Sequence, residues 1–95
     1  MPVVLKPAPR KLTAIIEPSE RVYVAFCPEL DLATEGDTPE ATLDDLIEMA
    51  LDYSEQYMAE FDRFSHSPNR AAHAAYVKTL RLNPTTAGAR NLFEA

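Results

Sequence analysis

The stretch YVAFCPELDLATEGDTPEATL, residues 23–43, decides the fold of this chain. It opens with alternating aromatic and β-branched residues, which are typical of a strand, and Pro28 ends that strand because proline has no N–H for a ladder hydrogen bond. Leu32 to Glu35 predicts a second short strand, closed by Gly36. Thr38 then offers a hydroxyl as a helix N-cap, and Pro39 suits the first helical position. The stretch therefore predicts two short strands followed directly by a helix.

A further strand is expected on the N-terminal side of this stretch. Residues 12–17 read as a strand, and residues 21–27 as its hairpin partner. The segment between them, Glu17-Pro18-Ser19-Glu20, predicts the turn, because proline pre-sets the backbone angle of a turn's second residue. Residues 1–10 contain three prolines and predict a flexible N-terminal arm.

The helix that starts at Thr38 is expected to run to about Phe64. Its apolar residues recur at steps of three or four, which predicts one continuous apolar stripe. A helix of that length is longer than a small sheet can cover, so its far end needs another partner, either a second subunit or the chain's own tail. We predict an oligomer interface there and a homodimer or a dimer of dimers. The interface residues would be Tyr57, Met58, Phe61 and Phe64.

The remaining tail is ambiguous. The alanines of residues 71–75 favour helix, yet residues 76–82 alternate like a strand, and we expect a strand at about 75–82. Asn83-Pro84 stops it, and residues 87–95 predict a frayed helix. The chain is then an α+β protein, with a three- or four-stranded antiparallel sheet and one long helix packed on it. We expect an arm at 1–10, a domain at 11–82 and a C-terminal tail at 83–95.

The net charge of −6 is unevenly distributed. Between Pro28 and Asp62 there are twelve acidic residues and no lysine or arginine, whereas both ends are mildly basic. Such a block repels nucleic acid and attracts a basic partner, although plain solubility explains any single carboxylate equally well. The candidate partner-binding residues are Glu29, Asp31, Glu35, Asp37, Asp44, Asp45, Glu48, Asp52 and Glu55.

Signals for catalysis or metal binding are weak. Cys27 is the lone cysteine and reads as a small buried hydrophobe, while His66 and His73 have poor metal-ligand spacing and read as solvated. A nuclease would need carboxylates that converge on one site, and the residues nearest to that pattern are Asp31, Glu35 and Asp37. We expect no catalytic residues, no metal and no cofactor, and hence a binding module rather than an enzyme. No apolar run is long enough for a membrane span or a signal peptide, so the cytoplasm is expected.

The stretch at residues 23–43 resembles the signature of the HicB-like antitoxin family, and the similarity extends over about residues 12–57. The resemblance rests on the Cys-Pro-Glu-Leu turn at residues 27–30 and on Gly-Asp-Thr at residues 36–38, which caps the helix. Family members usually have Glu-Ala where this chain has Ala41-Thr42. Many also have a C-terminal DNA-binding domain, for which residues 66–95 are too few.

The resemblance implies a partial ribonuclease H-like fold and the role of an antitoxin. Such a protein would neutralise a small basic mRNA-cleaving toxin by protein–protein contact. The alternative is a solitary homo-oligomeric HicB-like domain, with no toxin partner and an unknown binding role.

Overall fold

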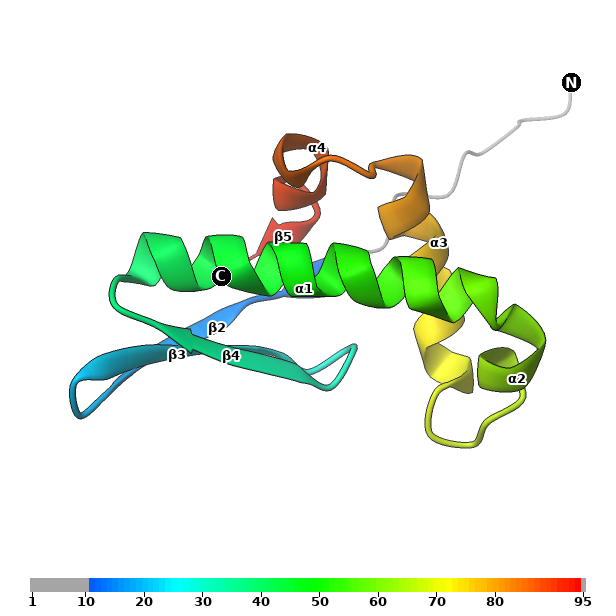
Figure 1. Ribbon diagram of the computed structural model, residues 1–95, viewed down its shortest axis with the longest axis horizontal. Coiled ribbons are helices and arrows are strands. Elements are labelled where there is room, and N and C mark those ends of the chain that lie inside the picture. The colour runs from blue at the N-terminus through cyan, green and yellow to red at the C-terminus, as the bar shows by residue number, and fades with distance from the viewer. Residues whose placement is uncertain (1–10, 95) are drawn as a thin grey trace, which may run out of the picture.

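Residues 11–94 are described by the computed structural model, in which one long helix crosses a small sheet (Figure 1). Strands β2 (Ile15–Ser19), β3 (Val22–Cys27) and β4 (Leu32–Gly36) form an antiparallel sheet in that order, and helix α1 (Pro39–Ala59) packs on one face. The predicted α+β architecture, with a three-stranded antiparallel sheet under a long helix, is confirmed. The predicted arm at 1–10 lies outside the described residues.

Alternation along β3 sets the two faces of the sheet. Ala25 and Cys27 are fully buried beneath α1, whereas Val24 and Phe26 point to the opposite face and are only half-buried. The small residues under the helix allow close approach of Leu46 and its buried neighbours on α1. One face of the sheet thus belongs to the core, while helix α1 leaves the other uncovered (Figure 1).

The hairpin turn lies two residues later than the sequence predicted. Pro18 pairs with Tyr23 inside the ladder, and the chain reverses at Glu20 and Arg21, where Glu20 takes a positive φ of 51°. Pro18 is tolerated because β2 is an edge strand, whose outward side does not need its N–H.

The Gly-Asp-Thr segment joins the sheet to the helix through two close contacts. The Thr38 hydroxyl accepts a hydrogen bond from the Ala41 N–H at 3.1 Å, as an N-cap should. A Cβ atom on Gly36 would lie 2.7 Å from Oγ1 of Thr42, a fully buried side chain whose hydroxyl donates to the Thr38 carbonyl at 2.5 Å. Glycine is therefore required at position 36 because the strand end and the first helical turn almost touch.

Gly36→Ala is expected to destabilise the protein by about 1–3 kcal/mol, because the new methyl group overpacks a site that cannot relax. Urea unfolding of Gly36→Ala, Thr42→Ala and the double variant measures the coupling between the two positions. The double variant should recover part of the loss. An equal cost of Gly36→Ala with and without the Thr42 hydroxyl would show that this contact is not the cause.

The sequence predicted one helix that runs to about Phe64, but the structure shows a break before that residue. Helix α1 ends at Ala59, because the backbone angles of Glu60 are not helical, and a short helix α2 (Phe61–Ser65) follows. This break turns Phe61 and Phe64 back toward Tyr57, with ring centroids 6.1 and 5.5 Å from the tyrosine ring.

The strand expected at about 75–82 is wrong, because this segment is a helix. A 3₁₀ turn η1 (Ala71–His73) leads into helix α3 (Ala74–Leu82). His73, Val77 and Leu80 are all buried at helical spacing, whereas a strand would have split Val77 and Leu80 between opposite faces. The sequence of this segment fits both a helix and a strand, and burial against α1 favours the helix.

Residues 83–94 also join the core. Helix α4 (Thr86–Arg90) precedes strand β5 (Phe93–Glu94), which pairs in parallel with β1 (Leu12–Thr13). Only the first part of the predicted frayed helix is helical, and Ala89 and Leu92 are buried. The sheet packs on one side of α1, and the tail elements α3 and α4 pack against α1 as well (Figure 1).

Candidate partner-binding surface

Four of the predicted partner-binding carboxylates form one line along the exposed side of α1. Asp45, Glu48, Asp52 and Glu55 follow one another at steps of three or four residues, and all four are exposed. We call this line the acidic stripe. Within residues 11–94, none of its members takes part in an ion pair. Its negative charge is therefore left for solvent or a partner.

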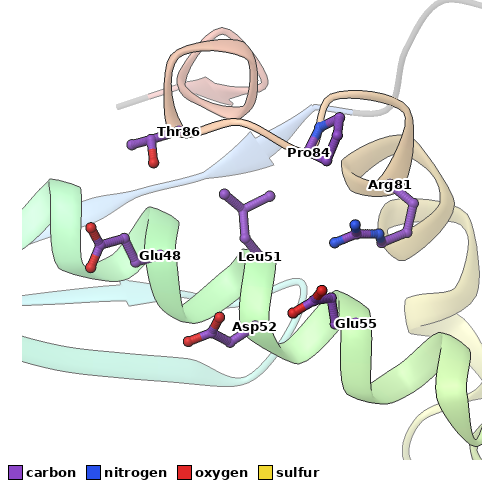
Figure 2. Close-up of a pocket in the computed structure, with 7 residues that line it drawn as sticks. All are labelled: Glu48, Leu51, Asp52, Glu55, Arg81, Pro84 and Thr86. Carbon is purple, nitrogen blue, oxygen red and sulfur yellow. The ribbon is translucent and has the colours of Figure 1, made fainter.

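A groove separates the acidic stripe from the tail, and we call it the tail groove. It has a volume of about 300 Å³ and is lined by Glu48, Leu51, Asp52, Glu55, Arg81, Pro84 and Thr86 (Figure 2). Arg81 extends from α3 toward α1 and donates to the Ser54 hydroxyl at 3.1 Å. Helix α3 thus contributes a cation to a groove that is also lined by three carboxylates.

A second groove lies on the other side of the acidic stripe, next to β4, and we call it the β4 groove. It has a volume of about 350 Å³ and is lined by Leu32, Asp45, Glu48, Met49, Asp52, Tyr53 and Gln56. Three of these side chains are apolar or aromatic and half-buried, three are exposed carboxylates, and none is basic. Asp45 accepts a hydrogen bond from the Thr34 hydroxyl, which holds the helix above the β4 strand.

The other predicted acids are not part of the acidic stripe. Asp44 forms an ion pair with Arg90 of α4. Glu35 alternates with Thr34 and so points to the far face of the sheet, and Asp37 is exposed in the link before α1. The structure therefore divides the nine predicted residues instead of gathering them on one surface.

Glu29 has an internal role. Its carboxylate accepts the Thr13 N–H at 2.8 Å and the Thr13 hydroxyl at 2.7 Å, which fastens β1 to the turn after β3. Partial burial acts to raise the pKa of Glu29, but these hydrogen bonds outweigh it and hold the pKa below its ordinary value. This carboxylate is already occupied by its own chain.

Asp31 meets a histidine that the sequence had placed in solvent. His73 is only 5% exposed; its Nδ1 shares a 2.7 Å hydrogen bond with the Tyr53 hydroxyl, and its Nε2 lies 3.8 Å from the Asp31 carboxylate. A proton on Nε2 lets Nδ1 accept from the tyrosine and points the N–H at Asp31. Asp31 itself has a positive φ of 55°.

The environment of His73 predicts loss of stability on acidification. Burial lowers the pKa of His73 and outweighs the opposing effect of the Asp31 carboxylate, while the Arg70 charge lowers the pKa slightly further. The unfolded chain therefore takes up the proton first, so this contribution to stability is present above about pH 6.5 and is lost as the pH falls toward the lower folded pKa.

Urea unfolding between pH 7.5 and 5.5 should show this loss. His73→Gln should flatten the pH dependence, whereas His66→Gln at an exposed position should keep it. Identical pH profiles for the wild type and His73→Gln would contradict the assignment.

Cys27 is buried in the core, as predicted. Burial is the main factor that raises the pKa of its thiol to about 12, which suppresses the reactive thiolate. Among residues 11–94, no three His, Cys, Asp or Glu side chains are grouped so that they could hold a metal ion.

The four residues predicted for an oligomer interface are mostly covered by their own chain. Tyr57 is fully buried and donates its hydroxyl to the Arg70 carbonyl at 2.8 Å. Phe61 and Phe64 are half-buried against the same core, while Met58 remains 40% exposed. The chain's own tail thus provides the cover that Tyr57 required, and this residue has no surface to offer a second subunit.

Comparison with known proteins identifies the family. Residues 4–94 match the family model described as the antitoxin of toxin–antitoxin, RelE / RelB, TA system. The chain belongs to this antitoxin family. No curated protein matches the antitoxin.

A solved structure has the same fold as the antitoxin. It is described as the antitoxin part of a proposed toxin/antitoxin system from Syntrophomonas wolfei subsp. wolfei, with a TM-score of 0.82 and 24% sequence identity. The match covers 90% of the present chain but 62% of the other, so the antitoxin spans less than two thirds of that protein. In the described part of the antitoxin, no helix is both long and apolar enough to cross a membrane.

Sequence reasoning missed the residues that the tail adds to this surface. Arg81 and Arg90 approach α1 from segments that had been read as a strand and a frayed end, and His73 had been read as solvated. The only signal was the excess of basic residues after Asp62. Placing them required the path of the tail.

Proposed function

We propose that this antitoxin is HicB-like, acts in the cytoplasm and neutralises a small basic mRNA-cleaving toxin by protein–protein contact, without catalysis of its own. The observation that carries the proposal is the acidic stripe, since Glu48, Asp52 and Glu55 are exposed and unpaired by any cation within residues 11–94. A line of carboxylates on a rigid helix attracts a cationic toxin and competes with RNA for its surface. No direct nucleic-acid contact is expected from so acidic a face.

Co-purification tests the proposal. The tagged antitoxin is isolated from its own host at low salt, and the proteins that accompany it are identified by mass spectrometry. The expected result is a small basic protein in stoichiometric amount that cleaves RNA when it is separated from the antitoxin. Recovery of the antitoxin alone, with no basic protein at low salt, would overturn the proposal.

Self-association is the second proposal, and it favours a homodimer or a dimer of dimers. It is supported by the face of the sheet that α1 leaves uncovered, where Ile15, Val24 and Phe26 are only half-buried, and by the outer edge of β2, which pairs with no other strand within residues 11–94. This surface would also serve a solitary homo-oligomeric domain with no toxin partner. A monomeric mass in light scattering at micromolar concentration would exclude the homodimer or dimer of dimers, and with it the solitary homo-oligomeric domain.

A further inference from the structure

We propose that the β4 groove is the docking site for an extended basic segment of the partner, which adds to the sheet as a strand beside β4. This inference rests on the proposed function for the identity of the partner, and on the groove itself for the chemistry of the segment. It narrows the proposed partner contact from the acidic stripe as a whole to the groove beside the edge of β4.

The walls of the β4 groove define the side chains that fit it. Leu32, Met49 and Tyr53 are half-buried and leave apolar surface in the hollow, while Asp45, Glu48 and Asp52 are exposed along its helix side. Among the described residues, no lysine or arginine lines it, and none of its three carboxylates takes part in an ion pair. The tail groove has the same Glu48 and Asp52 but contains Arg81, which supplies a cation from the chain itself. The β4 groove is therefore the side of the acidic stripe where a partner's cations are needed.

The open edge of β4 defines the backbone of the segment. Among residues 11–94, β4 pairs only with β3, so along its other edge the backbone groups have no described strand beside them. Edge strands bind extended peptides through main-chain hydrogen bonds, while alternate side chains enter pockets and give specificity. In an extended segment beside β4, every second side chain points to the face of the sheet on which α1 lies. Lysine or arginine at these positions would reach the carboxylates of α1, while their aliphatic stems would pack over Leu32 and Met49.

A second copy of the antitoxin fits this edge poorly. Its own β4 has the sequence Leu-Ala-Thr-Glu-Gly and no basic residue. Pairing two β4 edges would bring the two acidic stripes near each other, and like charges repel across such an interface. Charge complementarity therefore selects a basic partner for this edge.

Peptide binding to the full chain tests the inference. The probe is the capped peptide Lys-Val-Lys-Val-Lys-Val-Lys, and Glu-Val-Glu-Val-Glu-Val-Glu is its control. In NMR titrations of the ¹⁵N-labelled antitoxin, shifts should concentrate in β4 and residues 45–56, and the unpaired β4 amides should exchange more slowly with solvent. Shifts spread over other acidic surfaces, or no slowing in β4, would overturn the inference.

Matched variants separate this site from general attraction by charge. Glu48→Gln/Asp52→Asn should weaken the lysine peptide about tenfold at moderate salt, since two ion pairs are lost. Glu17→Gln/Asp62→Asn removes two exposed acids elsewhere and should change affinity less than twofold. Equal weakening by both pairs would overturn the site.

The two proposals fail separately. If a basic toxin co-purifies but its binding is indifferent to Glu48→Gln/Asp52→Asn, the groove is wrong and the antitoxin function stands. If no toxin is recovered while the peptide still binds along β4, the groove stands and the function is wrong.

Discussion

Replacing Tyr57 with alanine is expected to cost about 3–5 kcal/mol, the range found for large buried aromatic side chains. The side chain is fully buried, contacts the rings of Phe61 and Phe64, and satisfies the Arg70 carbonyl. Domains of this size have roughly 5–15 kcal/mol of stability in total, so the variant should melt at least about 12 °C lower. Thermal and urea unfolding followed by circular dichroism measure the loss.

Two controls show where the energy arises. Tyr57→Phe keeps the ring and loses the hydrogen bond to Arg70, which should cost about 1 kcal/mol. Met58→Ala changes the adjacent, partly exposed residue and should cost less than 1 kcal/mol. If Tyr57→Ala instead altered the oligomeric mass and left monomer stability unchanged, the residue would belong to a subunit interface after all.

Reversing the charge of three stripe residues is expected to have the largest effect on binding. Glu48→Lys/Asp52→Lys/Glu55→Lys should weaken the complex with the basic toxin that we propose as the partner by about 100-fold, because attraction is replaced by repulsion at the contact. The affinity should also lose most of its dependence on salt. Isothermal titration at two salt concentrations checks both effects.

Glu17→Lys/Glu20→Lys/Asp62→Lys is the matched control. It makes the same change in net charge at three exposed positions away from the acidic stripe. Its affinity should fall only slightly, through the long-range field. Equal losses in the two triple variants would mean that the toxin senses the overall charge and not this helix.

Local signals accounted for most of what the sequence predicted correctly. Thr38 and Pro39 start a helix through contacts within a single turn. Strands β3 and β4 can be recognised from their amino-acid composition and from the residues that end them. The hairpin was found but its turn was misplaced, because Pro18 suits both a turn and an edge strand.

What could not be predicted depends on contacts between distant residues. Residues 76–82 satisfy both a strand and a helix pattern, and only burial of Val77 and Leu80 against α1 decides between them. Glu29 and Asp44 look like free acids until Thr13 and Arg90 are placed beside them. The acidic block indicated the candidate surface, but these pairings decide which carboxylates remain available.

The pairing of β1 with β5 affects the order in which parts of the fold form and open, because it joins the two ends of the described chain. Lys11 donates to the Asn91 carbonyl at 2.8 Å, and the Leu12 N–H to the Leu92 carbonyl at 2.7 Å. These contacts join residues 80 positions apart, and closing such a long loop has an entropic cost. The contacts stabilise the fold only after this cost has been offset. Because each strand has only two residues, their pairing contributes little stabilising free energy. We therefore expect the β1–β5 pair to form after the sheet and α1, and to open first. Hydrogen exchange should therefore find the fold loosening from its joined ends while the hairpin beneath α1 stays closed.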